Sequence, residues 1–475
     1  MMIKYSLSLL FILSLTGLAS QKTEVKKPNI LFIISDDLSA YALSCYGNKI
    51  CKTPNIDRLA ETSSRFTQAY CQATYCGPSR ASFMSGYYPH ATGVFGYKSG
   101  RKAIGDRATW SEYFKNNGYH TARVSKIFHM PVPKGIELGN DGEDDERSWT
   151  ERFNSQGPEW KAPGIGETLE GNPEGKRPVM GGNTFVRVEA DGDDLVHSDG
   201  RTAQKAVELI HTYKKLEKPF FLAVGFVRPH VPFVAPKAYY KDYPWQEMPL
   251  PKRLKDDWKD IPKAGINYKT SLNMKMNQEQ QKKTISAYYA SVSYMDAQVG
   301  KVLTALEESD QEANTIVIFT SDHGFHLGEH DFWAKVSLYE ESTKVPLIIK
   351  VPGKKAARVD SFAELIDLYP TTSSLCGLAK QERLQGKDIS IMFDQNKAQV
   401  RDAILSANMK GVLIRNKNWA YMEYKDGKGG SQLFNMNKDP QQFYNQINNP
   451  EYASALNDLK QRLKKRIINL KTNGL

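Results

Sequence analysis

The sequence is poor in the features that mark several large classes of protein. It holds no internal repeats, no low-complexity tracts and no nucleic-acid-binding motif, and its lysines and arginines form no dense cluster interleaved with aromatic residues. After residue 20, no apolar run is long enough to cross a bilayer. Cysteine is scarce, at five in 475 residues. We therefore expect no nucleic-acid partner and no stable membrane insertion.

The start of the chain has the pattern of an export signal. A short apolar run, residues 5–18, follows Lys4 and precedes the small residues Ala19 and Ser20. This predicts a secretory signal peptide over residues 1–20, and the run is too short for a good membrane anchor. No cysteine follows the run, so a lipid-anchored form is not supported. Because the chain also lacks an Asn-x-Ser/Thr sequon, we expect a secreted, periplasmic or extracellular protein of bacterial origin.

Length and composition predict a globular protein of more than one unit. At 475 residues the chain is too long for one simple core, which favours one large domain and a smaller one. Its 40% hydrophobic and 25% charged residues are ordinary for this class. The formal net charge is +11. A basic surface suits an anionic polymer as partner, and it can equally serve solubility alone.

Apolar runs and a helical repeat predict an α/β sandwich. The runs at residues 29–35, 219–226 and 315–320 are typical of parallel strands buried on both faces. Between the last two, apolar residues recur at spacings of three and four over residues 285–306, which predicts a long amphipathic helix. In such folds, polar functional residues lie at the carboxyl ends of the strands.

Two segments differ from this alternation. Residues 138–200 are Gly-rich and acidic with little periodicity, which is typical of a loop-rich insertion or lid; its acidic cluster, residues 191–194, lacks the rest of a calcium loop and is interpreted as a solvated turn. After residue 384 the pattern changes to short strand-like pieces and one terminal amphipathic helix. We therefore expect a catalytic domain over residues 21–384 and a C-terminal α+β subdomain over residues 385–475, with a small antiparallel sheet. The expected pieces are strands at 411–415, 419–424 and 432–436, and a helix at about 452–470.

The most informative motif is residues 76–86, Cys-Gly-Pro-Ser-Arg-Ala-Ser-Phe-Met-Ser-Gly. Pro78 suits the first turn of a helix, so Cys76 is expected just before a helix N-terminus, where anions are favoured. The alternative is a half-buried cysteine in a turn, without chemistry. The motif is therefore interpreted together with the polar residues that follow the predicted strands.

Two acidic pairs follow predicted strands and can share a metal ion. Asp36 and Asp37 end the first strand, and Asp322 and His323 end another. Carboxylates at two strand ends can converge on one hard divalent cation. Taken alone, such a pair is more often a helix cap or a turn, but both pairs together with Cys76 favour a metal site.

The Cys76 motif resembles the signature of the type I sulfatases, in which the cysteine is oxidised to formylglycine. The resemblance covers nearly the whole mature chain, and within the family the pattern is most similar to the iduronate-2-sulfatase branch. The segments that carry it are residues 27–30, 36–37, 53–60, 76–86, 126–129, 220–225, 228–233, 288–296, 322–330, 333–335 and 439–440.

The resemblance implies an alkaline-phosphatase-like α/β fold with a large, mixed, mostly parallel sheet. It implies hydrolysis of sulfate esters on sulfated carbohydrate, with the 2-O-sulfate of a uronic acid as the first choice. A formylglycine-generating enzyme would convert Cys76, and the hydrated aldehyde would supply one hydroxyl to attack sulfur and another to release sulfate. One Ca²⁺ would be bound by Asp36, Asp37, Asp322 and His323, with residue 76 facing it.

The resemblance also implies roles for the remaining site residues. Arg80 and Lys126 would hold the formylglycine hydroxyls, and His129 would take the proton that triggers sulfate release. His230 and Lys335 would grip sulfate oxygens, and His230 would protonate the leaving alcohol. His326 and His330 have a spacing that metal ligands use, but they are expected to orient loops or contact substrate.

Two alternatives to a sulfatase, and the state of the cysteines, stay open at this level. The first alternative is a phosphodiesterase or phosphonate hydrolase of the same superfamily, which can carry the same motif, and the second is a non-catalytic protein that binds sulfated glycan. If Cys76 is modified, four cysteines remain. Cys45 and Cys51 can staple one loop, and free buried thiols fit equally well.

Overall fold

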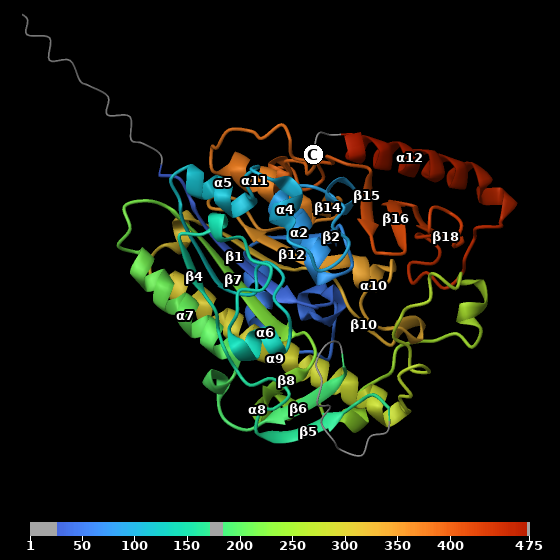
Figure 1. Cartoon of the computed structure of the whole chain (residues 1–475), viewed down its shortest axis with the longest axis horizontal. Coiled ribbons are helices and arrows are strands. Elements are labelled where there is room, and N and C mark those ends of the chain that lie inside the picture. Colours follow the sequence, from blue (N-terminus) through green and yellow to red (C-terminus); the bar gives the residue numbers. More distant parts are fainter. Residues whose placement is uncertain (1–25, 172–183, 473–475) are drawn as a thin grey trace, which may run out of the picture.

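A computed structural model of the chain describes residues 26–171 and 184–472. The predicted signal peptide, residues 1–20, lies outside the described residues. The molecule is built on a nine-stranded sheet of order β13-β2-β12-β9-β1-β7-β3-β4, with β14 paired to β2 (Figure 1). Its strands are β1 (Asn29–Asp36), β2 (Ser64–Tyr70), β3 (His120–Ser125), β4 (Glu151–Phe153), β7 (Phe220–Pro229), β9 (Thr315–Ser321), β12 (Lys344–Lys350), β13 (Ala357–Val359) and β14 (Ala363–Glu364).

The three predicted apolar runs form the centre of this sheet. β1 lies between β7 and β9 and is parallel to both. All residues of these three strands are buried, as expected for strands covered on both faces. The parallel alignment brings Ser35, Ser321 and Phe226 to one edge. The polar residues that follow β1 and β9 therefore meet at that edge.

Helices cover both faces of the sheet (Figure 1). One face packs on α1 (Pro54–Glu61), α7 (Ser198–Tyr213) and α9 (Gln278–Glu308), and the other on α2 (Cys76–Ser85), α5 (Trp110–Asn116) and α11 (Leu368–Leu375). The predicted long helix is confirmed as α9. It begins earlier than the apolar repeat because Asn277 and Gln280 form a capping box.

The segment predicted to be rich in loops contains short strands. β5 (Gly164–Thr168) and β6 (Val186–Ala190) form a three-stranded sheet with β8 (Phe233–Pro236). Two contacts tie the segment to the end of β7: a buried ion pair between Glu159 and Arg228, and backbone N–H groups of β7 that donate to Asp199. These strands are too short to give a clear alternation in the sequence. Within the described part of the chain, this segment is an anchored layer rather than a free lid.

The acidic turn at residues 191–194 is also more engaged than predicted. Asp194 accepts hydrogen bonds from Lys301, Gln298 and Tyr239. Most of the hydrogen-bonding capacity of the Asp194 carboxylate is therefore used in holding the turn against the neighbouring helices. The five cysteines, all described, are free thiols, so the staple between Cys45 and Cys51 is not formed in this structure.

The C-terminal unit is a four-stranded antiparallel sheet with a long terminal helix (Figure 1). Its first strand begins at Ala403. The segment before that strand contributes Ile389, Met392 and Phe393 to the core of the large sheet, so it packs with the large domain. The elements of this unit are β15 (Ala403–Ala407), β16 (Gly411–Asn416), β17 (Trp419–Tyr424), β18 (Ser431–Asn435) and α12 (Ala453–Thr472).

The remaining elements are short. None of the helices over residues 26–171 and 184–472 combines the length and apolarity that a membrane span requires. The short elements are α3 (Pro89–Thr92), α4 (Gly100–Ile104), α6 (Lys134–Leu138), α8 (Lys237–Tyr240), α10 (Glu340–Thr343), β10 (His326–Leu327) and β11 (Trp333–Ala334).

Candidate active site

The carboxyl ends of β1 and β9 bring the two acidic pairs together. The Asp37 backbone N–H donates to Asp322 Oδ1 at 3.2 Å. Asp37 has φ 63°, in the left-handed region that costs energy for a residue with a side chain. Tyr288 of α9 holds this turn, since its hydroxyl donates to Asp37 O at 2.7 Å and accepts from Ser39 N at 2.8 Å. The strained turn is therefore fixed by the helix beneath it.

Helix α2 delivers Cys76 to the same point. Cys76 was predicted just before the helix, but the helix begins one residue earlier and includes it as the first residue. Ser79 anchors the first turn by donating to Asp322 O at 2.5 Å. The Cys76 Sγ atom lies 3.2 Å from His323 Nε2 and 3.6 Å from Asp37 Oδ1. Residue 76 is fully buried. The helix N-terminus adds a favourable field for an anion at this place.

Arg80 is a buried connector between the strand ends. Its Nε donates to Asp322 Oδ2 at 2.9 Å, and one terminal nitrogen donates to Asp36 Oδ1 at 3.1 Å. The other terminal nitrogen donates to the carbonyls of Lys126 and Ile127. Four of its five N–H groups are thus engaged. One N–H remains for a group bound at residue 76.

Two lysines complete the charge balance. Lys126 Nζ contacts Asp36 Oδ2. Lys335 Nζ lies 2.6 and 2.8 Å from the two Asp37 oxygens and 3.2 Å from Cys76 Sγ. All of these side chains are 0–1% exposed. With Arg80, the three cations offset the three carboxylates, so a bound divalent cation would leave the site positive and suited to an anionic ester.

Burial and neighbouring charges shift the pKa values of this cluster in opposite directions. Burial alone would raise the pKa of Asp36, but the charges of Lys126 and Arg80 hold it well below its usual value. Burial raises the pKa of Asp37, although Lys335 opposes the shift. Burial and Asp36 raise the pKa of the Cys76 thiol well above its usual value. An unmodified Cys76 would therefore stay protonated and be a poor nucleophile.

His230 and His323 each present one ring nitrogen to the site. His323 Nδ1 lies 2.9 Å from Gly324 O, and His230 Nδ1 lies 2.5 Å from Val231 O. Because a carbonyl oxygen only accepts, Nδ1 carries the proton in both rings and Nε2 offers its lone pair. Burial lowers the pKa of His230, which favours the neutral ring.

His129 lies at the rim and is held by an aromatic contact. Its ring stacks on Tyr97, with centroids 3.9 Å apart and planes at 15°, and Tyr75 packs on Tyr97 at 4.6 Å. The buried Nδ1 of His129 has no hydrogen-bond partner among the residues that the structure describes. Burial, with the nearby Lys126 charge, lowers the pKa of His129 to about 2. The ring is therefore neutral and free to accept a proton.

Some functional candidates carried little signal in the sequence. Tyr75 directly precedes Cys76, which could have drawn attention to it, but the stack on Tyr97 depends on the fold. Tyr75 and Tyr268 also border a small, largely apolar pocket of ≈ 220 Å³.

The two histidines expected to orient loops or contact substrate, His326 and His330, are engaged elsewhere. His326 Nε2 contacts Ser337 Oγ at 2.6 Å, and His330 Nδ1 contacts Asp257 at 2.8 Å.

The donor set fits a hard divalent cation. Ligand-type atoms of Asp36, Asp37, Cys76 and His230 lie within 4.8 Å of one another, and a second such group contains Cys76, Asp322 and His323. Carboxylate oxygens are the ligands that Ca²⁺ prefers. The hydrogen bond at His323 Nδ1 turns the Nε2 lone pair toward the same centre, in the way that metal-binding histidines are oriented.

Comparisons with known proteins agree with this arrangement. The sulfatase family model matches residues 28–378, and the model described as N-sulphoglucosamine sulphohydrolase, C-terminal, matches residues 328–469. The chain is 33% identical to a sulfatase of Formosa agariphila, over 93% of this chain and 87% of that protein. It is 35% identical to iduronate 2-sulfatase of Homo sapiens, over 74% of this chain and 69% of that protein.

Solved structures with the same fold include two different activities. One is named a 2-O GAG sulfatase, with a TM-score of 0.73 and 23% identity over 94% of this chain and 93% of that chain. Another is the phosphonate monoester hydrolase of Silicibacter pomeroyi, with a TM-score of 0.78 and 20% identity over 94% and 96%. At such identities the likeness shows the fold alone. The family match over residues 28–378 shows more: the chain belongs to the sulfatase family of sulfuric ester hydrolases.

Proposed function

We propose that the protein hydrolyses sulfate esters on sulfated carbohydrate, and the substrate group we favour is the 2-O-sulfate of a uronic acid. One observation carries the proposal: residue 76 lies at the start of α2, between His323, Asp37 and the ammonium of Lys335. This places one reacting position where three carboxylates, a helix N-terminus and buried cations meet. Such a fixed set of charges is what a sulfate ester needs when its leaving oxygen develops charge.

The proposal takes residue 76 as formylglycine. The raised pKa of the Cys76 thiol supports this, because a protonated thiol would have to lose its proton before it could react. The hydrated aldehyde supplies two hydroxyls on one carbon, one for attack on sulfur and one for release of sulfate. Since Cys76 is fully buried, the formylglycine-generating enzyme would have to reach it before folding is complete.

We propose that Asp36, Asp37, Asp322 and His323 hold one Ca²⁺. When bound, such an ion neutralises sulfate oxygens and polarises the sulfur. Around it, the chain's own residues have distinct tasks. Arg80 fixes the orientation of two of these carboxylates, since its donors reach both Asp36 and Asp322.

Lys335, Lys126 and His230 would bind the anionic parts of the substrate. Lys335 contacts residue 76 directly, whereas Lys126 contacts Asp36. Lys335 is therefore placed to grip a sulfate oxygen, and Lys126 to hold a hydroxyl of residue 76 together with the last N–H of Arg80. His230 Nε2 faces the same space. Its lone pair can take up the proton that the attacking hydroxyl of residue 76 loses, and His230 is our choice as donor of that proton to the leaving alcohol.

His129 would act in the second half of the reaction. Its neutral ring can take a proton from residue 76 as sulfate is released. The stack on Tyr97 fixes the plane of the ring, and the absence of a partner for Nδ1 among the described residues leaves the ring without a competing hydrogen bond there.

Support for the carbohydrate comes from the relatives' names and from the aromatic rim. Two relatives, of Mus musculus and Homo sapiens, are named iduronate 2-sulfatase and are 34% and 35% identical. Tyr75, Tyr97 and Tyr268 lie beside the site, and Tyr97 is 45% exposed. Exposed aromatic faces pack well on sugar rings, because these rings present apolar C–H surfaces. The phosphonate hydrolase rival has only the likeness of fold in its favour.

The decisive experiment measures sulfate release from defined substrates. Purified protein, with conversion of residue 76 checked by mass spectrometry, is given oligosaccharides that end in a 2-O-sulfated uronic acid, their 6-O-sulfated counterparts, and a matched phosphonate monoester and phosphodiester. We expect sulfate release to be fastest from the 2-O-sulfate and at least about a hundredfold faster than either phosphorus ester. Faster turnover of a phosphorus ester would support the rival enzyme. Tight binding without any turnover would support a non-catalytic protein.

A further inference from the structure

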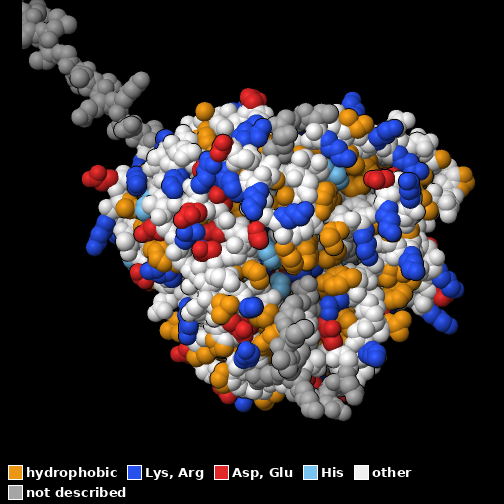
Figure 2. Space-filling model, viewed as in Figure 1, with side chains coloured by type: hydrophobic (Ala, Val, Ile, Leu, Met, Phe, Trp, Pro, Cys, Tyr) orange, Lys and Arg blue, Asp and Glu red, His pale blue; other side chains and the backbone are white. Residues whose placement is uncertain are grey.

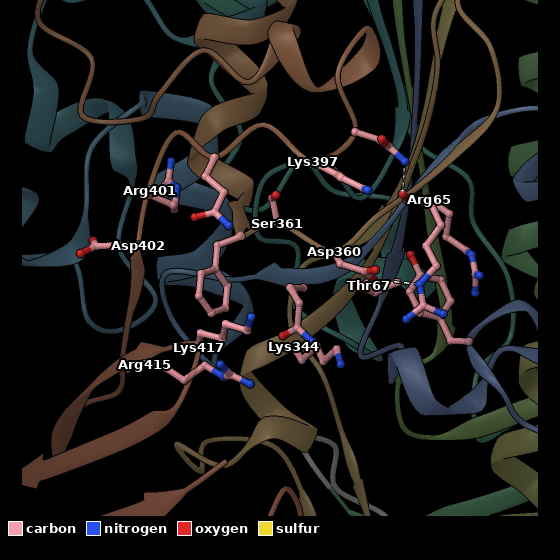
Figure 3. Close-up of a pocket in the computed structure, with 16 residues that line it drawn as sticks. Arg65, Thr67, Lys344, Asp360, Ser361, Lys397, Arg401, Asp402, Arg415 and Lys417 are labelled. Carbon is pink, nitrogen blue, oxygen red and sulfur yellow. Dashed lines mark hydrogen bonds and ion pairs between the residues drawn. The ribbon is translucent and has the colours of Figure 1, made fainter. Parts of the chain in front are cut away.

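A basic cleft lies at the opposite edge of the large sheet from β3 and β4. It is bordered by β2, β13, the segment before β15, and the turn between β16 and β17, and its volume is ≈ 830 Å³ (Figure 3). None of the candidate active-site residues is among the residues that line it. The cleft therefore joins the large domain to the C-terminal sheet without belonging to the site around residue 76. On the face shown in Figure 2, most of the charged side chains on the C-terminal part are Lys and Arg.

The cleft forms where one face of the sheet is not covered by helices. Side chains alternate along a strand, so Phe66 of β2 enters the core while its neighbours Arg65 and Thr67 face the other way. That other face is covered over the central strands, where Ile348 of β12 packs with α1 and α9. Beyond β12, Tyr46 lies across this face, and its hydroxyl is 3.1 Å from the carbonyl oxygens of both Phe66 in β2 and Leu347 in β12. Arg65 and Thr67 are therefore half-buried beside Tyr46.

Charged groups in the cleft are strongly unequal in sign. Both carboxylates that line it are already paired: Asp360 with Arg358 at 2.8 Å, and Asp402 with Arg462 of α12 at 2.7 Å. Against these two stand seven cationic side chains, namely Arg65, Lys344, Arg358, Lys397, Arg401, Arg415 and Lys417.

Four of the seven cations have no carboxylate within ion-pair distance among residues 26–171 and 184–472. They are Arg65, Lys344, Lys397 and Lys417, and Figure 3 shows them around one central space. The other three are used in structure, since Arg401 contacts Glu364 and Arg415 contacts Glu340. Burial, together with the like charges of Arg415 and Arg358, lowers the pKa of Lys344 despite two nearby glutamates. The cleft thus holds four cations close together, and none of its own carboxylates pairs with them.

We propose that this cleft binds a stretch of sulfated polysaccharide as a second, non-catalytic site. Its four unpaired cations come from four segments, β2, β12, the loop after residue 394 and the β16–β17 turn, so they can meet several sulfate groups spaced along one chain. Arg65 offers a planar guanidinium suited to a sulfate oxygen pair, and the lysines add point charges. The volume lies in the range of sites that hold a few sugar units.

Protection of a sheet edge explains only part of this charge. Basic residues on an edge strand prevent pairing with other chains, which accounts for Arg358 of the edge strand β13 but not for Arg65, because β2 is paired on both sides. Lys397 and Lys417 lie on loops, where no strand edge needs protection. The inference rests on the sulfated carbohydrate proposed above, because that substrate class supplies the polyanion.

The test removes three of these charges away from residue 76. The variant Arg65→Gln/Lys397→Gln/Lys417→Gln is compared with Lys27→Gln/Lys215→Gln/Lys218→Gln, which removes the same charge from exposed positions that precede β1 and β7. Heparin serves as the sulfated polysaccharide, and its binding to the full chain is measured by titration at fixed salt. We expect the cleft variant to bind heparin about tenfold more weakly, with the control within twofold of wild type.

Two results would overturn the proposal, and a parallel activity assay separates its failure from that of the proposed function. Equal heparin affinity in the two triple variants would overturn the proposal. Equal binding of double-stranded DNA by the wild type, lost to the same degree in the cleft variant, would also overturn it, because the cleft would then be a general polyanion surface. Hydrolysis of 4-nitrophenyl sulfate is followed in parallel and should be the same in all three proteins. If wild type hydrolyses no sulfate ester, the proposed function fails, whereas the heparin comparison still reports on the cleft.

Discussion

The active site and the basic cleft use charge in opposite ways. Around residue 76, Asp37 and Lys335 are 0–1% exposed and paired with each other. In the cleft, Lys397 and Lys417 are exposed and have no carboxylate partner within the described residues. Removing one member of a buried pair leaves the other charge without water or partner, which costs about 3–5 kcal/mol. Removing an exposed cation costs almost nothing to the fold. Buried charges therefore fix geometry, and exposed ones give attraction.

The largest effect is expected from Asp37. Asp37→Asn removes a carboxylate that faces both residue 76 and Lys335, and with it a proposed calcium ligand. We expect kcat/KM for a sulfate ester to fall by at least about 10³-fold. Calorimetric titration with calcium should show weaker binding in the variant. Circular dichroism and thermal unfolding show whether the fold survives.

Asp360 of the cleft is the matched control. Asp360→Asn removes a carboxylate whose side chain is 63% exposed and pairs with an exposed arginine. We expect kcat/KM to be unchanged and the free energy of unfolding to stay within about 0.5 kcal/mol. If the two variants lose activity equally, the contrast between buried and exposed charge does not hold.

The second effect concerns His129 and pH. The pKa of His129 is lowered to about 2, so the ring stays neutral as pH falls through 6.5 and its protonation cannot cause an acid limb there. His129→Gln should lower kcat by about 10²-fold at every pH between 5 and 8. The position of any acid limb should be unchanged. An inflection near pH 6.5 in wild type that disappears in the variant would contradict the lowered pKa.

The third effect tests how closely the backbone packs behind the site. A Cβ atom added at Gly225 of β7 would lie 2.1 Å from Lys126 O, which also accepts from Arg80. Gly225→Ala must therefore shift the backbone of Lys126, and with it the carbonyl that Arg80 binds, so we expect kcat/KM to fall about 10–100-fold. Gly96→Ala adds the same methyl group into open space and should change kcat/KM less than threefold. Equal effects would mean that this backbone contact does not set the site.

The sequence allowed the buried, regular parts to be predicted well. The runs that became β1, β7 and β9 are apolar throughout because both faces are covered, and the repeat of α9 is long enough to be unambiguous. The acidic pairs could be placed together because parallel strands end at one edge. The fold, the family and the enzyme class follow from these patterns and the Cys76 motif, and the structure and the comparisons confirm them.

Other features depend on contacts between distant residues and left no pattern. The sheet of β5, β6 and β8 joins segments that are far apart in the chain, and its short strands do not alternate clearly. The engagement of Arg80 with backbone carbonyls needs the path of residues 126–127. The stack of Tyr97 on His129 and the cleft between β2 and the β16–β17 turn likewise exist only after folding. The composition gives a net charge of +11 but not where on the surface that charge lies.

The fourth effect separates binding from proton transfer at His230. A sugar alkoxide is a poor leaving group and needs a proton, whereas nitrophenolate leaves without one. His230→Gln should therefore lose about tenfold more activity on a sugar sulfate than on 4-nitrophenyl sulfate. Equal losses on both would mean that His230 only grips the sulfate. The proton donor would then be sought at Lys335, whose ammonium lies 3.2 Å from Cys76 Sγ.

The smallest effect is salt dependence, and it bears directly on the two kinds of charge. The attraction that exposed cations exert is screened beyond a Debye length, which is about 10 Å at 0.1 M salt and about 3 Å at 1 M. Buried pairs are screened much less. Raising the salt across this range should increase KM for a sulfated polysaccharide about fivefold in wild type. The rise should shrink to about twofold in Arg65→Gln/Lys397→Gln/Lys417→Gln, because fewer exposed charges remain to be screened. KM for 4-nitrophenyl sulfate should change less than twofold in both proteins, since that ester meets only the buried charges around residue 76. Equal salt sensitivity for polymer and small ester would show that the long chain gains nothing from the cleft, and the division between a buried reacting centre and an exposed attracting surface would have to be given up.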